Sequence, residues 1–475
     1  MTLALCLVIV AGTMLGALLY GRRRARTVTD WAIGGRRFGT WLFWFANAGE
    51  IYTTFAVLGI SGYAWAYGAP AYLAFTSVSL ASALGYWLMP RIWAAGQREG
   101  LVTQADFFER HYGATWLSII VAVAGIAALI VYVQIQLTAL SLVFRLVGTG
   151  ITPLQSALAA ATVMLAFVYI AGLRSAAFAA GVKDVMMIVL VVTLSITVAS
   201  KVGATSMLDV FEQVQDRHPA IGAFPGLQPS AQLTNTWLVT AALNVALGTW
   251  IFPHLFQLIF SARGEEAIRR NAVWQPLYSL SYFFILLLGF AALLAGTVPP
   301  DGSSNAVLLQ FVSERYPPWA VGLLAGTACL LALVPGSILL LGAASIFGRN
   351  VVLPFKRDLP DGTVLWISRT ALIGFAGIAV WLTLTSNRSL VDIGLSAYAA
   401  IGMLAPGVFL AFLWPRANAW GVFAGIVAGY ASLLLPAAQS FWSQHLPEWD
   451  RGLVAMGINA IVAVGVSLVT PGRGD

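Results

Sequence analysis

The sequence is poor in charge, in cysteine and in histidine. Only 9% of its 475 residues are Asp, Glu, Lys or Arg, whereas 59% are hydrophobic, which excludes an ordinary soluble domain and is typical of a polytopic membrane protein. The two cysteines, Cys6 and Cys329, both fall in apolar runs, so neither a disulfide framework nor a metal site is predicted. The four histidines are scattered and no nucleophile converges with them, so we expect no catalytic residue, no cofactor and no enzyme.

The net charge is +7, and most of the basic residues that produce it lie between the apolar runs. In a soluble protein such a charge would suggest nucleic acid as a partner. Here the expected partners are the lipid bilayer, a small-molecule solute and a coupling cation, with no nucleic acid. The sequence carries no motif that fixes the oligomeric state.

Thirteen apolar runs are long enough to cross a hydrocarbon core about 30 Å thick, which takes roughly 20 residues each. They lie near residues 2–20, 39–67, 70–96, 116–147, 153–172, 184–200, 236–260, 274–297, 319–346, 366–386, 393–414, 419–435 and 452–470. The basic cluster Arg22, Arg23, Arg24 and Arg26 follows the first run instead of preceding it, and no A-x-A-like site comes after it. We therefore predict an uncleaved first helix instead of a signal peptide.

The distribution of Lys and Arg predicts the orientation in the membrane. With the amino terminus outside, the loops on the cytoplasmic side hold 20 of the 26 basic residues. We therefore expect a multi-pass protein of a bacterial-type inner (plasma) membrane, with its carboxyl terminus in the cytoplasm. The long segments 201–235 and 298–318 are expected outside.

Glu50 lies in the middle of an apolar run, beside Gly49 and ahead of Gly59 and Gly62. A charged side chain at bilayer depth costs about 2.5–3.5 kcal/mol even on the mildest scale, so it usually faces a cavity or a partner and marks a transport pathway. We expect the helix to unwind around residue 49 and to expose main-chain dipoles to a pocket.

A second interrupted run lies five helices later. It contains Asn244, Gly248, Thr249, Pro253 and His254. Two interrupted helices at corresponding places in two halves of a chain indicate an inverted-repeat transporter, in which freed backbone groups line a central cavity.

Four segments in order resemble the solute:sodium symporter family. They are DWAIGGRRFG from Asp30, AGEIYTTFAVLGISGYAWAYG, LVTQADFFERHYG from Leu101 and WIFPHLFQLIFSA from Trp250. The likeness extends over nearly the whole chain. The stretches GEIYTTF and YVQIQLT look most like bacterial members related to monocarboxylate carriers.

The resemblance implies an all-α membrane protein with a LeuT-type 5+5 inverted repeat. In such a fold the chain divides into a leading helix and basic cytoplasmic loop (2–38), a first repeat (39–200), a second repeat (236–414) and two trailing helices (419–470). Members of the family typically import sugars, amino acids, vitamins or carboxylates, driven by sodium.

The resemblance also implies a cation site. Its main-chain ligands align with Gly49, Tyr52 and Leu331, but the two adjacent hydroxyl positions of the family fall on Val334 and Pro335, which have no side-chain oxygen. Sodium, like calcium and magnesium, prefers oxygen ligands, so this departure leaves two alternatives, a rebuilt site or none. In a rebuilt site Ser337, Thr53 or Thr54 would supply the missing oxygen.

Glu50 offers a second route to coupling. A carboxyl group buried in a bundle can take up and release a proton, or it can pair with sodium, so the coupling ion is expected to be sodium or a proton. A structural role for Glu50, tying two helices together, stays open. His254 and Asp184 are interpreted as structural groups, with Asp184, beside Lys183, capping the start of its helix.

The candidate solute-binding residues are Thr53, Gln136, Gly248, Thr249, Trp250 and Tyr398. Gln136 shares a helix face with Tyr132, whereas Gln134 points elsewhere. We predict a secondary transporter that imports a small polar solute, with a monocarboxylate or similar organic acid as the leading hypothesis. The alternatives are an uncoupled uniporter and a transporter-like sensor or receptor.

Overall fold

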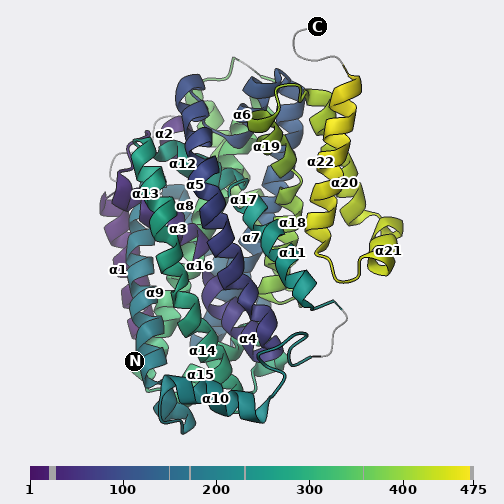
Figure 1. Cartoon of the computed structure of the whole chain (residues 1–475). Helices are drawn as coiled ribbons and strands as arrows, with labels where there is room; N and C mark the ends of the chain where they lie inside the picture. Colours follow the sequence, from purple (N-terminus) through teal and green to yellow (C-terminus); the bar gives the residue numbers. More distant parts are fainter. Residues whose placement is uncertain (21–27, 149, 171–172, 229–231, 357, 471–475) are drawn as a thin grey trace.

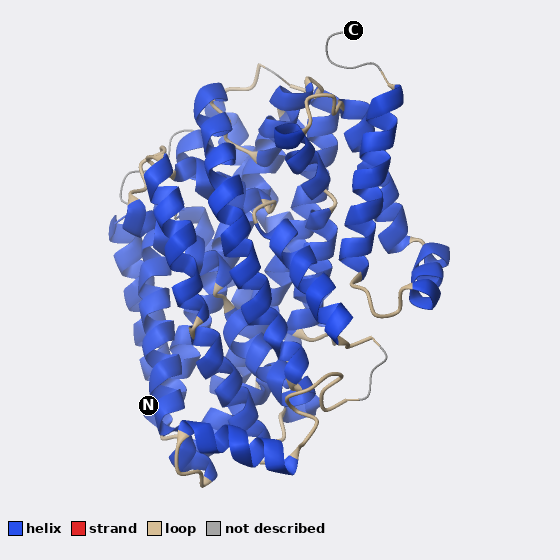
Figure 2. Ribbon diagram, in the orientation of Figure 1, coloured by secondary structure: helices blue, strands red, loops and turns tan. Residues whose placement is uncertain are grey.

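The computed structural model describes residues 1–20, 28–148, 150–170, 173–228, 232–356 and 358–470. Within these residues the chain forms helices, turns and an isolated β-bridge between Phe38 and Ala262, and no strand (Figures 1 and 2). The predicted all-α architecture is confirmed. The basic cluster at residues 22–26 lies outside the described residues.

Eight described helical spans are long and apolar enough to cross a membrane. They are α1 (Thr2–Tyr20), α5 (Leu73–Glu99) with its preceding turn, α7 (Thr115–Val147), α9 (Leu173–Val202), α13 (Glu265–Ser279) with α14 (Ser281–Leu294), α16 (Pro318–Ile346) with η5 (Phe347–Val352), α17 (Asp361–Thr385) and α22 (Arg451–Val469). Two shorter apolar segments are η1 (Phe55–Gly59) with α4 (Ile60–Tyr67), and α8 (Pro153–Ile170).

Three bent helix pairs raise the number of described spans to eleven if each pair crosses the membrane once. They are α11 (Asn235–Thr249) with α12 (Pro253–Ser261), bent by 50°, α18 (Leu390–Gly402) with α19 (Ala405–Leu413), bent by 42°, and α20 (Ala419–Leu434) with α21 (Pro436–His445), bent by 76°. With the two shorter segments, every one of the thirteen predicted runs corresponds to helix.

Short helices cover the two ends of the bundle. Figure 1 shows α10 (Met207–Arg217) and α15 (Val307–Arg315) at the end where the amino terminus lies. Helix α6 (Gln104–Tyr112) and the short α2 (Val28–Ile33) lie at the opposite end. The two ends are therefore built from different parts of the chain.

The core of the bundle is built around α16. In the most apolar 18-residue stretch of α16 and η5, 94% of the residues are buried, whereas in that of α1 only 17% are buried. Helix α16 is therefore a central helix, and α1 is an outer helix that presents its surface to lipid. The two helices pack together, and the Sγ atoms of the free thiols Cys6 and Cys329 lie 3.9 Å apart across their contact.

One predicted boundary is wrong. The sixth run was expected to begin at residue 184, whereas α9 begins at Leu173. The adjacent charges Lys183 and Asp184 lower the local hydropathy and imitate a helix end, although both side chains are fully buried inside the bundle. The interpretation of Asp184 as an N-terminal cap is wrong for the same reason, since it lies in the interior of the helix.

Candidate cation and solute site

The first core span is broken just after Glu50. Helix α3 (Thr40–Ile51) ends at the C-cap Tyr52, whose backbone angles, φ −96° and ψ 80°, are not helical. The π-helical turn η1 begins three residues later at Phe55. The nonhelical residues are therefore Tyr52 and Thr53, and the break begins three residues beyond the position predicted from the glycine. It leaves carbonyl groups of the last turn of α3 without helical partners.

A lysine side chain fills this break. Nζ of Lys183 on α9 donates hydrogen bonds to the carbonyl oxygens of Gly49, at 2.9 Å, and of Tyr52, at 2.8 Å. The same atom lies 2.7 Å from Oδ1 of Asp184, and both side chains are fully buried. Gly49 and Tyr52 are the residues expected to present carbonyl oxygens to a cation. We call these two carbonyls with the Asp184 carboxylate the carbonyl cradle.

Gly49 permits this close approach of α3 and α9. A Cβ atom built on it would lie 3.1 Å from Cβ of Ala180, 3.4 Å from Nζ of Lys183 and 3.5 Å from Oδ2 of Asp184. The first distance is tighter than ordinary van der Waals contact. A side chain at position 49 would push the lysine out of the cradle or separate the helices.

Glu50 faces the second broken span. Its Oε2 atom lies 3.4 Å from Nε2 of His254, and each side chain is 1% exposed. Oε1 of Glu50 and Nδ1 of His254 have no hydrogen-bond partner among the described residues. The sequence predicted a role for Glu50, whereas His254 was expected to be a structural group. The contact could have been predicted from one feature of the sequence: each residue lies beside the break of its own interrupted helix.

The second break separates α11 from α12. Trp250, Ile251 and Phe252 form the connection, and Pro253 begins α12, where a missing amide hydrogen is tolerated. Gly248 faces Tyr398, because a Cβ atom on it would lie 3.5 Å from Cδ1 of that ring.

The side chains of the two residues after Gly248 both donate hydrogen bonds to carbonyl groups of the protein. The Thr249 hydroxyl donates to the Val245 carbonyl at 2.7 Å, and the Trp250 indole donates to the Ala81 carbonyl at 2.6 Å. Trp250 is thus held against α5.

An aromatic cluster brings three spans together beside Glu50. The ring centroids of Tyr132 and Phe252 are 5.3 Å apart, those of Phe252 and Tyr398 5.1 Å, and those of Phe252 and His254 5.5 Å. Tyr132 comes from α7 and Tyr398 from α18, so residues from both predicted repeats enclose the same place.

Gln136 lies one turn beyond Tyr132 and is fully buried. Its Oε1 accepts a hydrogen bond from the Thr54 hydroxyl at 2.8 Å, and its Nε2 has no hydrogen-bond partner among the described residues. The Thr53 hydroxyl accepts from the Phe55 amide at 3.2 Å. Gln134, as expected, points elsewhere and donates to the Leu382 carbonyl of α17 at 3.2 Å.

Helix α16 passes behind this region. Pro335 lies inside it, and because proline has no amide hydrogen, the carbonyl of Leu331 lacks its usual helical partner. The Ser337 hydroxyl donates to the Val334 carbonyl at 2.6 Å, within its own helix. The expected substitute ligand is therefore engaged locally.

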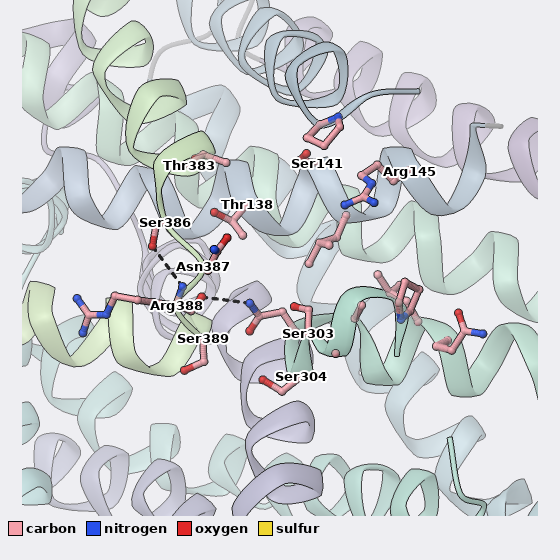
Figure 3. Close-up of a pocket in the computed structure, with 18 of the residues that line it drawn as sticks. Thr138, Ser141, Arg145, Ser303, Ser304, Thr383, Ser386, Asn387, Arg388 and Ser389 are labelled. Carbon is pink, nitrogen blue, oxygen red and sulfur yellow. Dashed lines mark hydrogen bonds between the residues drawn. The ribbon is translucent and has the colours of Figure 1, made fainter. Parts of the chain in front are cut away.

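A cavity of about 1090 Å³ opens at the end of the bundle that holds the amino terminus (Figure 3). It is lined by polar residues of α7, of the segment before α15, and of the connection between α17 and α18. Arg145 and Arg388 bring positive charge to it from different elements. The Arg388 guanidinium donates to the Asp392 carbonyl at 2.9 Å and the Ser396 hydroxyl at 2.8 Å, so it is held in place at one wall.

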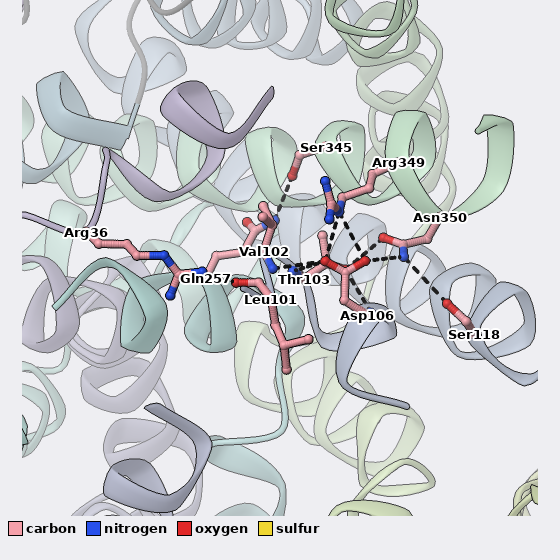
Figure 4. Close-up of polar contacts among 10 residues, drawn as sticks. All are labelled: Arg36, Leu101, Val102, Thr103, Asp106, Ser118, Gln257, Ser345, Arg349 and Asn350. Atoms are coloured by element: carbon pink, nitrogen blue, oxygen red, sulfur yellow. Dashed lines mark hydrogen bonds and ion pairs between the residues drawn. The ribbon is translucent and has the colours of Figure 1, made fainter. Parts of the chain in front are cut away.

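A polar network involves α6, which lies at the opposite end of the bundle (Figures 1 and 4). Asp106 at the start of α6 accepts from the amides of Val102 and Thr103 and forms an ion pair with Arg349 of η5 at 2.8 Å. Nδ2 of Asn350 also donates to Asp106, at 2.8 Å. We call Asp106, Arg349 and Asn350 the α6–η5 latch. It ties the segment before α7 to the end of α16.

The family profile described as "Sodium:solute symporter family" matches residues 31–429, most of the chain. This chain belongs to the sodium:solute symporter family. It is 31% identical to "Uncharacterized symporter YhjB" of Bacillus subtilis (strain 168), over 98% of this chain and 97% of that protein. It is 28% identical to "Monocarboxylate transport permease protein" of Rhizobium johnstonii, over 97% of this chain and 95% of that protein.

The sodium:solute symporter fold is confirmed by a solved structure. With 15% identity and a TM-score of 0.80, 99% of this chain matches 98% of the chain described as the "Substrate-bound outward-open state of a Na+-coupled sialic acid symporter". The predicted LeuT-type fold is thereby confirmed. The family and the fold are those of symporters, which are transporters rather than enzymes, and the family and the apolar helices indicate an integral multi-pass membrane protein.

Sodium does not fit the carbonyl cradle of this symporter as the chain folds here. The two carbonyl oxygens expected to bind the ion already accept hydrogen bonds from Lys183, and the two positions on α16 where the family resemblance implies hydroxyl ligands are Val334 and Pro335. The donor set that a sodium ion needs is therefore partly engaged and partly missing.

Proposed function

We propose that this symporter imports a small monocarboxylate by cation-coupled alternating access. The observation that carries the proposal is the position of the two helix breaks, between a polar cavity at one end of the bundle and the α6–η5 latch at the other. A cavity toward one side of the bundle and a tied contact toward the other are the asymmetry expected of one of the two states of an alternating-access transporter.

A carboxylate solute is supported by charge and by kinship. Arg145, Arg388 and one carboxylate, Asp392, line the cavity, so its charged lining carries one net positive charge, and a positive potential in a cleft with low-dielectric walls raises the local concentration of anions. A relative that aligns over almost the whole chain is described as a monocarboxylate transport permease. The cavity opens on the side that the distribution of basic residues predicts to be outside, so the proposed direction is import.

The solute would bind between the two breaks. Nε2 of Gln136 is a buried donor without a protein partner among the described residues, and a buried donor left unpaired costs about 1–3 kcal/mol. A carboxylate oxygen placed there would satisfy it. We propose Thr53, Gln136, Gly248, Thr249 and Tyr398 as the lining of this site, with Trp250 as the residue that anchors the second break to α5.

Uptake into proteoliposomes tests the proposal. The purified protein is reconstituted and supplied with [14C]pyruvate, [14C]lactate or [14C]acetate, with inward sodium and proton gradients imposed separately. We expect at least one solute to enter faster than into protein-free liposomes, and to accumulate under one of the gradients. Equilibration without accumulation would indicate a uniporter. Saturable binding without any entry would indicate a receptor.

Two arginines at the same end of the molecule provide a matched pair of variants. Arg388→Gln should raise the KM for the carboxylate several-fold, because an exposed charge contributes about 1 kcal/mol or less. Arg315→Gln, at the exposed end of α15, should leave KM unchanged, since Arg315 does not line the cavity. If both substitutions changed KM equally, Arg388 would have no specific role in the solute pathway.

A further inference from the structure

We propose that the Lys183 ammonium group is the built-in cation of the carbonyl cradle and keeps sodium out of it. The inference deepens the proposed function, because it concerns which ion can couple transport. Its evidence is independent of any solute.

The lysine nitrogen itself contacts the oxygen atoms that were expected to bind a cation. Nζ of Lys183 lies 2.9 Å and 2.8 Å from the two carbonyl oxygens and 2.7 Å from Asp184. These three oxygens come from two different helices and converge on one nitrogen atom. A sodium ion bound to the same oxygens would lie beside a second positive charge in a dry interior, where repulsion is much stronger than in water.

The two hydroxyl donors that the family resemblance implies are also absent from this chain. The family resemblance puts two hydroxyl side chains at positions 334 and 335, which here are Val334 and Pro335. The hydroxyl of Ser337 donates to the carbonyl of Val334 instead of pointing to a ligand. An ammonium group carries its own three donors and needs only acceptors around it, whereas a metal ion needs several oxygen ligands. The presence of Lys183 among the carbonyls and the absence of hydroxyls at positions 334 and 335 therefore have the same explanation, namely that an ammonium group replaces the metal ion.

The charge of the lysine is compensated locally. Asp184 forms its ion pair, and both side chains are fully buried, so neither charge could persist without the other. Glu50 on α3, Tyr278 on α13 and Tyr52 on α3 are the other ionisable groups that interact with this pair. His254 on α12 lies next to Glu50, with Nε2 at 3.4 Å from Oε2 of the carboxyl group.

The expected consequence is transport that does not depend on sodium at this site. If the proposed function holds, uptake should proceed equally well when all sodium is replaced by N-methyl-D-glucamine. A coupling cation other than sodium would then drive accumulation. Direct binding of sodium can be measured without a solute, so its outcome does not depend on whether the monocarboxylate hypothesis is correct.

Binding of 22Na+ to the purified full-length protein tests the inference. We expect no saturable binding to the wild type and about one additional equivalent bound by Lys183→Ser. That substitution removes the ammonium group and leaves two carbonyls, the Asp184 carboxylate and a new hydroxyl as oxygen donors. Lys201→Ser, at the partly exposed end of the same helix, is the matched control and should behave as the wild type. Saturable wild-type binding would overturn the inference, and so would equal binding by wild type and Lys183→Ser.

A second measurement needs no variant and guards against misfolding of Lys183→Ser. The thermal unfolding temperature of the wild type is compared in sodium chloride and in choline chloride at equal ionic strength. A ligand that binds only the folded state raises that temperature. Because the wild type is proposed not to bind sodium, we expect the same unfolding temperature in the two salts. Specific stabilisation by sodium would contradict the proposal.

Discussion

The imidazole of His254 and the carboxylate of Glu50 lie 3.4 Å apart although 204 positions separate them in the chain. Each side chain comes from beside the break of a different interrupted span, so this contact joins the two predicted repeats at the place where both lose helical structure. Both groups are almost fully buried. A carboxylate in such surroundings needs a partner or a proton, and His254 is the nearest candidate partner.

Replacing Glu50 with Gln is expected to uncouple transport from the ion gradient. The amide keeps the size of the side chain but neither binds a proton nor pairs with a cation. Gradient-driven accumulation should fall about tenfold, which corresponds to about 1.4 kcal/mol, whereas exchange of solute across the membrane should persist. Accumulation and counterflow are measured in the same proteoliposomes. Unchanged accumulation would leave Glu50 with only a structural role.

Gly49→Ala is expected to destabilise the protein by about 1–3 kcal/mol, the usual cost of overpacking. The added methyl group would lie 3.1 Å from Cβ of Ala180 and next to the Lys183 ammonium group. Thermal unfolding in detergent measures the loss. Gly12→Ala on the outer helix α1 is the control, because a methyl group added there would meet no described atom within 4 Å. A Gly49→Ala variant as stable as Gly12→Ala would mean that the contact between α3 and α9 is loose.

Gln136 and Gln134 form a natural pair for testing the solute site. Gln136 bonds Thr54 beside the first break, whereas Gln134 bonds the Leu382 carbonyl of a neighbouring helix. Gln136→Ala should raise KM for the transported carboxylate by about tenfold to about a hundredfold through loss of a charge-assisted hydrogen bond of about 1.5–3 kcal/mol. Gln134→Ala should leave KM within about twofold. The reverse order of effects would place the solute elsewhere.

Asp106→Asn is expected to loosen the α6–η5 latch. The substitution weakens the ion pair with Arg349 and the capping interaction with the Thr103 amide. A cysteine introduced at Ser345, in a background with Cys6 and Cys329 replaced by Ala, should then react several-fold faster with a maleimide. Glu109→Gln on the same short helix is the control, since Glu109 bonds Thr115 and is not part of the latch. Equal labelling in the two variants would show that the latch does not restrict access.

Much of the fold could be predicted from the sequence because the bilayer imposes a length. A span needs roughly 20 apolar residues, and composition shows where they are. The interrupted first span was also predictable, since Gly49 and Glu50 stand out in an apolar run. The actual break lies at Tyr52 and Thr53, because the glycine serves to let α9 approach and the nonhelical backbone begins after it.

The candidate cation site could be predicted only in part. The sequence singled out the carbonyls of Gly49 and Tyr52 as ligands of a coupling cation, and in the structure both accept hydrogen bonds from Lys183. Lys183 and Asp184 looked like the polar start of a helix, since a charge at bilayer depth is unfavourable when considered alone. The pairing of Glu50 with His254 was missed because residues so far apart in the chain share no local pattern.

The sequence by itself determined the number of apolar spans, the two interrupted helices and the family, because each depends on composition or on local motifs. Only the tertiary structure decided that a lysine of α9 fills the break in the first span and that the two interrupted helices meet through Glu50 and His254. The physical reason is that a buried charge is tolerated only where oxygen atoms and opposite charges surround it, and those partners are assembled by helix packing between distant parts of the chain.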